Sequence, residues 1–523
     1  MILHLDPIFS FANLPPKYRA NLKAYPECLF QSLSILSTHS KSINPTMSRT
    51  DRKDQIRANF NTSANARDGW IDRNKDYYAD DRRYVKFLIP EGKRILELGC
   101  GTGDLLSQLK PSYGVGVDFS EGMIEVAQGR HSDLTFLVGD AEDNEFLSGL
   151  DGPFDYIVLS DTIGYLDDIE RVFRSLRKIS EPHARLVVAY YSHLWEPALA
   201  LAERLGQKMP QPDVNYLSSS DITNLLYLAN FEVVRTEWRQ LIPKSLLGIG
   251  TVINRFIGTL PLIRRLCLRH YIVARPFERR TDWKPSVSVL IPCRNEKGNI
   301  ESAVTRMPRF AVDMEILYVE GHSSDGTFEE CERVRDAYAG EWEIHVAQQE
   351  GKGKGDAVRK GFDMANNDIL MILDADLTVA PEDLPRFYQA ISEGTGEFIN
   401  GTRLVYPMEK GAMRFLNYWA NRTFALIFSF LLNQRFSDTL CGTKVLSKKH
   451  YDAISAGRDY FGEFDPFGDY DLIFGAAKLN LKITEVPIRY ADRTYGEPQI
   501  SRFRDGFLLL RMVVFAWRKL KAF

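Results

Sequence analysis

Short apolar runs alternate with amphipathic segments along most of the chain. In the first part, we expect strands at 94–98, 115–118, 134–140, 154–161, 185–191, 231–238 and 269–276. The segments between several of these runs have helical periodicity, at 103–110, 120–128, 167–179 and up to about 205. Such alternation predicts a parallel sheet with helices on both faces.

A second alternation begins near residue 287. Apolar runs at 287–292, 315–320, 343–348 and 368–376 are separated by helical segments, and two amphipathic segments follow at 411–434 and 502–521. The polar stretch 278–285 is typical of a linker. We therefore expect two α/β domains in tandem, over residues 47–277 and 286–523.

Residues 1–46 differ from the rest. Proline pairs and Ser/Thr clusters interrupt them, no periodicity lasts, and the basic start of a signal peptide is missing. Met47 opens a polar run. We expect the native chain to begin at Met47 and 1–46 to be a poorly ordered extension, with a short ordered arm as the alternative.

Composition narrows the possible roles. The 523 residues are 44% apolar and 26% charged, and the net charge is −3. These values indicate globular protein and give no reason to expect a nucleic-acid partner. Six scattered cysteines fit a reducing cytoplasm. No apolar run reaches the roughly 20 residues that span a bilayer.

The first chemical signal is ELGCGTG, Glu97 to Gly103, between a predicted strand and a helix. Its glycines allow a sharp turn and close approach of a ligand. Asp118 ends the next strand, where a carboxylate can bind ribose hydroxyls. A dinucleotide site would need Gly or Ala where Asp104 stands, so NAD is the weaker interpretation. A domain that has lost its ligand is the other alternative.

This constellation resembles the class I S-adenosylmethionine-dependent methyltransferases. The resemblance implies strand order 3-2-1-4-5-7-6, with 243–268 as an insertion between the last two strands. It implies that Glu97 and the loop glycines hold the cofactor, that Asp118 binds its ribose, and that Asp140 and Ala141 lie beside its adenine. The loop glycines are Gly99, Gly101 and Gly103. Tyr165 and His193 occupy positions where residues on the substrate side of the site usually lie. A purely structural role is the alternative for each.

The second signal is DAD, Asp374 to Asp376, at the end of an apolar strand. Carboxylates at i and i+2 of a strand point the same way and repel each other unless a cation joins them. Mg²⁺ or Mn²⁺ bound to a nucleotide diphosphate is the natural partner. The alternative is a solvated strand end.

Further polar residues follow the neighbouring strands at the same expected sheet edge. They are Pro292, Arg294, Glu296, Glu320 and Asp325, and a Gly-Lys loop with Lys354 precedes a helix suited to phosphate.

Together these motifs resemble family-2 inverting glycosyltransferases of the GT-A fold, and among them the polyprenyl-phosphate glycosyltransferases. The resemblance implies that Asp374 and Asp376 bind the metal and that Glu296, Glu320 and Asp325 hold the nucleoside. Arg403 and Arg493 would bind phosphate. The chain departs from the family pattern at Thr378 and Gln499, where the family often has Gln and Lys.

A lipid phosphate acceptor is already anionic at pH 7, so it needs cations rather than a strong base. If the acceptor is instead a soluble or glycan hydroxyl, Asp469 or Asp471 could serve as the base. A third hypothesis keeps one half as a non-catalytic scaffold.

Arg504, Arg511 and Arg518 recur every seven residues along an apolar helix, and Phe424 to Leu432 is strongly apolar. Both segments fit either an interfacial membrane helix or a core helix. We therefore predict two Rossmann-like α/β domains in tandem, a class I methyltransferase followed by a GT-A glycosyltransferase. The predicted enzyme would use S-adenosylmethionine, Mg²⁺ or Mn²⁺, and a UDP- or GDP-hexose. It would glycosylate polyprenyl phosphate from the cytoplasm, peripherally attached to the inner face of the membrane.

Overall fold

The computed structural model describes residues 49–212, 214–406, 415–462, 468, 470–489, 495 and 502–523. The chain divides into two compact units, Met1–Gln55 and Ile56–Phe523. The second unit contains residues 56–277 of the first predicted domain and all of the second. The predicted extension 1–46 lies outside the described residues, and so do Asp469, Arg493 and Gln499.

The first half contains strands β1 to β7. Their bounds are Arg94–Leu98, Tyr113–Asp118, Thr135–Val138, Phe154–Ser160, Ser180–Tyr191, Phe231–Arg239 and Arg269–Pro276. Helices α3 to α12 are Arg49–Ser63, Arg67–Arg73, Lys75–Leu88, Asp104–Gln108, Glu121–Arg130, Asn144–Ser148, Ile169–Lys178, Glu196–Arg204, Ser219–Leu228 and Ile249–Val252.

The second half contains strands β8 to β14. Their bounds are Val287–Cys293, Met314–Glu320, Glu343–Gln348, Ile369–Ile372, Phe398–Thr402, Lys444–Ser447 and Ile483–Pro487. Helices α13 to α20 are Ile300–Thr305, Thr327–Ala337, Lys354–Met364, Leu384–Ser392, Phe415–Leu432, Lys448–Ala456, Tyr470–Lys478 and Arg502–Leu520.

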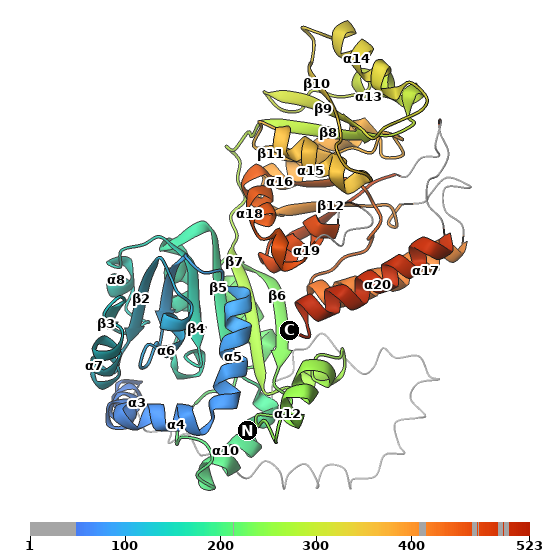
Figure 1. The fold of residues 1–523 in the computed structure, drawn as a ribbon. Coiled ribbons are helices and arrows are strands. Elements are labelled where there is room, and N and C mark those ends of the chain that lie inside the picture. The colour runs from blue at the N-terminus through green and yellow to red at the C-terminus, as the bar shows by residue number, and fades with distance from the viewer. Residues whose placement is uncertain are drawn as a thin grey trace, which may run out of the picture. The chain divides into compact units, whose positions relative to one another are not determined.

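The first sheet has the order β3-β2-β1-β4-β5-β7-β6, as the methyltransferase resemblance implies. Its strands are parallel except for β7, which runs antiparallel to β5 and β6. Alternate residues of β1 enter different cores: Ile95 packs with α5, α6 and α7, whereas Leu96 packs with α9 and α11. Helices therefore cover both faces of this sheet, as Figure 1 shows.

The second sheet has the order β10-β9-β8-β11-β13-β12-β14. Strands β8 to β11 are parallel, and β13 is antiparallel to both of its neighbours. Val289 and Leu290 of β8 enter cores on opposite faces. The two-domain α/β prediction is therefore confirmed, although strands β12, β13 and β14 were not predicted.

Helix α17 packs mainly into the core, whereas α20 has one buried side and one exposed side. In α17, Phe428, Leu431 and Leu432 are buried and Leu426 is exposed, so Phe424 to Leu432 packs mainly into the core and the prediction of an apolar membrane surface there is wrong. In α20, Met512 is also buried. The described helices include none long and apolar enough to cross a bilayer.

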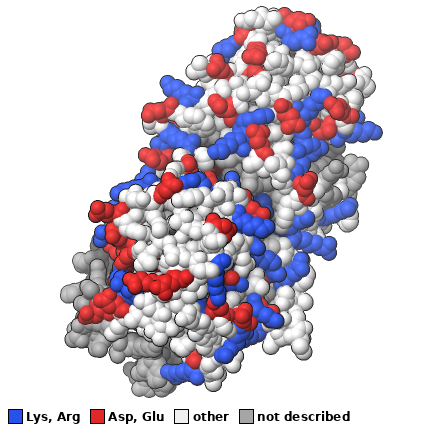
Figure 2. Space-filling model, turned by 60° about the vertical axis from the view of Figure 1, so that its left-hand side comes forward, with Lys and Arg blue, Asp and Glu red and all other residues white. Residues whose placement is uncertain are grey.

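Polar contacts join the two halves of the unit Ile56–Phe523. Arg185 on β5 pairs with Glu397 at 2.7 Å, and Lys521 pairs with the buried Glu237 of β6. On the face drawn in Figure 2, acidic and basic side chains are interspersed over both halves. That face therefore carries no broad patch of one sign.

Candidate active sites

The glycine-rich loop of the first half turns directly from β1 into α6. Gly99, Gly101 and Gly103 all have left-handed backbone, with φ of 73°, 52° and 77°. A Cβ at Gly99 would lie 2.2 Å from the Thr162 hydroxyl oxygen, and one at Gly103 would lie 2.6 Å from the Phe136 ring. Only glycine fits these positions of the loop.

Asp118 ends β2 beside this loop. Its Oδ2 accepts a hydrogen bond from the Gly101 amide at 2.9 Å, and its Oδ1 accepts one from the Ser120 amide at 2.9 Å. Burial raises the pKa of Asp118 above its ordinary value. Each oxygen keeps a lone pair for a further donor, which a pair of ribose hydroxyls could supply.

Asp140 lies at the same sheet edge. It follows β3, which pairs with β2 in parallel, and the Gly139 amide donates to the Asp118 carbonyl at 3.0 Å. The Asp140 side chain accepts from the Glu142 amide at 2.9 Å, and Ala141 stands between them. The structure therefore brings Asp118, Asp140 and Ala141 to one edge.

Glu97 is the most perturbed acid of this site. It is 3% exposed. Among the described residues, its Oε2 has no hydrogen-bond partner. Burial, helped by Asp104, raises its pKa to about 8. A buried oxygen that lacks a donor beside a glycine cradle fits a cationic ligand such as S-adenosylmethionine.

Sequence reasoning missed Arg67. Its guanidinium Nε lies 3.0 Å from the place where a Cβ on Gly101 would stand. Burial acts to lower the pKa of Arg67, but Tyr78 and Asp118 raise it overall. This cation beside the glycine loop could pair with the carboxylate of an amino-acid ligand. No motif marks it, because α4 precedes the first strand.

The two substrate-side candidates have different environments. Tyr165 packs edge-on against Phe60, at 5.2 Å between ring centroids, and burial raises its pKa. His193 is exposed. A cavity of about 20 Å³ near β4 and β5 is lined by Asp161, Ile163, Gly164, Tyr190, Tyr191, Val214, Asn215, Tyr216 and Leu217. Neither candidate lines this cavity.

In the second half, Asp374 follows β11, and its carboxylate contacts Lys354 of the glycine-lysine loop. Its Oδ1 accepts from the Lys354 ammonium at 2.6 Å. Burial acts to raise the pKa of Asp374, but Lys354 outweighs it and the pKa lies below its ordinary value. Lys444, buried on β13, acts in the same direction. A Cβ at Gly442 would lie 1.8 Å from the Asp374 carboxylate, so the chain packs closely here.

Asp376 is held by Thr378, the residue that departs from the family pattern. The Thr378 hydroxyl donates to Asp376 Oδ1 at 2.8 Å and its amide donates at 3.1 Å. Thr378 therefore orients Asp376 instead of adding a side-chain carbonyl. Asp374 and Asp376 place two carboxylates just after β11, a pair that suits a hard divalent cation that also binds phosphate oxygens.

Two acids lie at the carboxyl ends of β8 and β9: Glu296 follows β8, and Glu320 is the last residue of β9. Glu320 accepts from the Ser323 amide and from Gln348 at 2.9 Å. Glu296 accepts from Asn299 at 2.8 Å. Strands β8 and β9 pair in parallel register, with Cys293 opposite Glu320, so these acids lie at the same edge as Asp374.

The other residues predicted to bind the nucleotide sugar at this edge are Asp325, Pro292 and Arg294. Asp325 accepts from the Thr327 hydroxyl at 2.5 Å and the Thr327 amide at 3.1 Å, and these bonds outweigh burial and lower its pKa. Pro292 lies within β8, and Arg294 just after it is exposed. The structure brings the predicted donor-side residues to one sheet edge.

Arg403 follows β12 and forms a two-pronged pair with Asp438. Its Nε and NH2 donate to the two carboxylate oxygens at 2.7 and 2.8 Å. Asp438 is 0% exposed. Burial acts to raise its pKa, but Arg403 lowers it overall. Asp438, which pairs with Arg403, was not predicted.

Asp469 and Asp471 are the residues predicted as the base for a hydroxyl acceptor. Asp471 on α19 pairs with Arg458 at 3.3 Å. Asp469 lies outside the described residues, but its neighbour Gly468 is closely packed: a Cβ there would lie 2.2 Å from the Gly355 amide nitrogen. Gly468 therefore packs against the start of α15, beside Lys354.

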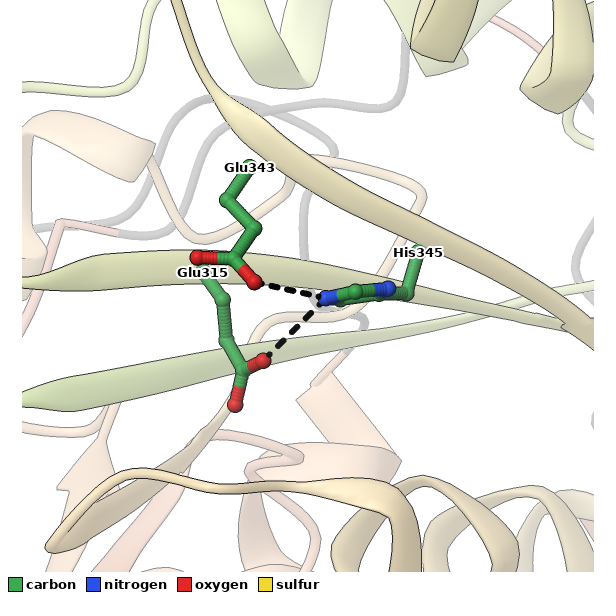
Figure 3. A group of neighbouring side chains, drawn as sticks. All are labelled: Glu315, Glu343 and His345. Atoms are coloured by element: carbon green, nitrogen blue, oxygen red, sulfur yellow. Dashed lines mark hydrogen bonds and ion pairs between the residues drawn. The ribbon is translucent and has the colours of Figure 1, made fainter.

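A separate ionisable cluster lies at the opposite edge of this sheet (Figure 3). His345 Nε2 lies 3.1 Å from Glu343 and 3.4 Å from the buried Glu315, and ligand atoms of the three side chains fall within 4.8 Å of one another. Glu315 also accepts from the Ser288 hydroxyl and the Asn366 amide. Partners within the chain thus account for this cluster, at the far end of the strands from Asp374.

Both halves of the chain are similar to known protein families. Residues 71–236 match the family model "Methyltransferase domain", and residues 288–454 match "Glycosyl transferase family 2". Glycosyltransferase AglJ of Haloferax volcanii is 31% identical over 43% of this chain and 69% of its own length. A dolichol-phosphate mannosyltransferase of Pyrococcus furiosus is 27% identical over 41% of this chain and 59% of its own length.

Among solved structures, a SAM-dependent methyltransferase of Thermotoga maritima covers 42% of this chain and all of its own, at 23% identity and a TM-score of 0.34. The glycosyl transferase family 2 model covers the part of the chain that holds Asp374 and Asp376. The chain belongs to glycosyl transferase family 2 through its second half, and its first half is a methyltransferase domain.

Proposed function

We propose that the second half transfers a hexose from UDP- or GDP-hexose to a polyprenyl phosphate at the membrane face. The first half, in the same proposal, transfers a methyl group from S-adenosylmethionine to an acceptor that is still to be identified. The arginine-carboxylate pair at Arg403 is the observation that supports the lipid phosphate acceptor best.

Arg403 is a cation held in place by its counter-ion Asp438. Because Arg403 holds the pKa of Asp438 below its ordinary value, Asp438 is a poor proton acceptor at pH 7. Asp471 is likewise engaged by Arg458. A hydroxyl acceptor needs a base, whereas a phosphate monoester needs only positioning by cations.

The residues around Asp374 suit the donor. Lys354 and the amides at the start of α15 offer positive charge to a diphosphate. Asp374 and Asp376 would hold Mg²⁺ or Mn²⁺, which neutralises the diphosphate as it leaves. Glu296, Glu320 and Asp325 lie where ribose and base would bind, at the same edge.

The acceptor can be tested by comparing a polyprenyl phosphate with the polyprenol of the same chain length. Both would be offered in detergent with radiolabelled UDP- and GDP-hexoses and Mg²⁺ or Mn²⁺. We expect label in the phosphate only, because the alcohol lacks the anionic nucleophile. Labelling of the alcohol, or of a soluble glycan hydroxyl alone, would contradict the proposal and favour Asp469 as the base.

The methyl donor proposal depends on the first half. Glu97 offers a buried oxygen without a partner in the described chain, Arg67 offers a cation, and Asp118 offers two oxygens that are already oriented. These groups match the sulfonium, carboxylate and ribose parts of S-adenosylmethionine. Isothermal calorimetry with S-adenosylmethionine, beside NAD as a control, should show heat for the first ligand only. Binding of NAD alone would refute it.

A further inference from the structure

The segment between β6 and β7 exposes an unusual amount of apolar surface. It contains α12, a π-helical turn over Ile253–Ile257 and a 3₁₀ turn over Ile263–Leu266. Leu247 is fully exposed and Leu262 is 83% exposed. The exposed apolar side chains of this insertion are Leu246, Leu247, Ile249, Val252, Phe256, Ile257, Leu260, Leu262 and Leu266. A contiguous set of this kind marks an interaction site.

All charged side chains of the insertion are basic. No Asp or Glu occurs between Glu237 and Glu278. Lys244, Arg255 and Arg265 are exposed among the apolar side chains. The insertion therefore combines apolar side chains with cations only.

The insertion is held in a defined shape. The Asn254 side chain accepts from the Ile242 amide at 2.8 Å and donates to the Ile242 carbonyl at 2.8 Å. Arg264 donates to Asn433 at 2.9 Å. Leu246 and Leu247 have left-handed backbone, with φ of 47° and 58°, which leucine rarely adopts. This strained turn holds Leu247 outward, so the apolar tip is built into the fold.

We infer that the insertion 240–268 is a docking element for the surface of an anionic phospholipid bilayer. Its leucines would enter the acyl boundary while Lys244, Arg255 and Arg265 meet lipid phosphates. The inference deepens the proposed function, on which it rests, because a polyprenyl phosphate acceptor lies in such a surface. It assigns the membrane contact to the methyltransferase half.

The insertion is continuous with α20 of the second half. Arg255 donates to the Ala522 carbonyl at 2.6 Å, and the Phe256 and Trp517 rings lie 5.6 Å apart. Figure 1 likewise shows α12 beside the carboxyl end of the chain. Over residues 507–518, α20 exposes Phe507, Leu510 and Val514 together with Arg511 and Arg518. Both halves thus add to one apolar and basic surface.

The charge of this surface favours an anionic bilayer over a second copy of this chain as the binding partner. A twofold dimer through this surface would set its cations against the same cations of the partner. An anionic lipid surface complements them instead, and each basic residue near it adds to binding.

The test uses the full chain and sedimentation with two kinds of vesicle, phosphatidylcholine alone and phosphatidylcholine mixed with phosphatidylglycerol. The variant replaces three exposed leucines, Leu246→Asn, Leu247→Asn and Leu262→Asn, because asparagine tolerates left-handed backbone. Val312→Ser, at a site in the second half that is 78% exposed, is the matched control. S-adenosylmethionine binding and the melting temperature report whether the variants fold.

We expect the wild type and the Val312 variant to sediment with the anionic vesicles. The triple variant should lose about tenfold or more in partition, with its melting temperature and cofactor binding unchanged. Equal sedimentation of the triple variant would overturn the inference. So would a wild type that stays in solution with both vesicles, or that self-associates through these leucines in sedimentation velocity runs.

The proposal of a polyprenyl phosphate acceptor and the proposal of a membrane-docking element can be refuted independently of each other. If sugar transfer to polyprenyl phosphate in detergent is absent while the leucines still control vesicle binding, the acceptor proposal fails and the docking element stands. If transfer in detergent is normal in every variant while vesicle binding is unaffected, the docking element fails and the acceptor proposal stands.

Discussion

Glu97 should make the stability of the methyltransferase half depend on pH. Its pKa is about 8 in the folded protein, against 4.5 for the ordinary group. Between these values the unfolded chain has lost the proton and the folded chain keeps it. Stability therefore falls as pH rises from about 4.5 to about 8, and is constant above that.

The size of this effect follows from the two pKa values. Each pH unit in the window costs about 1.4 kcal/mol. At pH 7.5 the cost is about 4 kcal/mol, and near pH 5 it is under about 1 kcal/mol. Glu97 is 3% exposed, so solvent screening reduces this only slightly. Glu97→Gln removes the titrating group, and we expect it to gain about 2–4 kcal/mol at pH 7.5 and almost nothing at pH 5.

The measurement is urea unfolding of the ligand-free protein from pH 5 to 8.5, for the wild type and for Glu97→Gln. Glu125→Gln, at an exposed position of α7, serves as the control and should follow the wild type. A constant difference between Glu97→Gln and the wild type at all pH values would refute the reasoning, because it would show that Glu97 does not hold a proton in the folded chain.

Three further predictions concern ligand binding and transfer. Asp118→Ala should weaken S-adenosylmethionine binding by about 1.5–3 kcal/mol in calorimetry through lost charge-assisted hydrogen bonds, and unchanged affinity would remove Asp118 from the site. Asp376→Asn should lose several kcal/mol of transition-state stabilisation, and sugar transfer should stop in chelator and return with Mg²⁺ or Mn²⁺; full activity in chelator would contradict the metal assignment. Arg403→Ala should abolish transfer but leave nucleotide-sugar binding intact, with Arg403→Lys partly active; a fully active Arg403→Ala would show that the acceptor phosphate is positioned elsewhere.

Much of the fold follows from local pattern. Strands such as Arg94–Leu98 and Arg269–Pro276 were predicted at their observed bounds, because buried parallel strands are continuous apolar runs between turn residues. The sequence also predicted the glycine loop and the DAD pair, because a tight turn and a pair of neighbouring carboxylates each permit few residue types. Strands β12, β13 and β14 were missed. They are four or five residues long, and each of them pairs with a strand distant in sequence.

The sequence by itself determined the two α/β folds, the order of their motifs and the residue types at both sites. Only the tertiary structure decided which apolar segments are buried: Phe424 to Leu432 packs mainly into the core, whereas the insertion 240–268 stays exposed. It also decided that Asp438 pairs with Arg403 and that Arg67 lies beside Gly101. These outcomes depend on which elements pack together across long sequence separations, and composition and periodicity carry no record of that pairing.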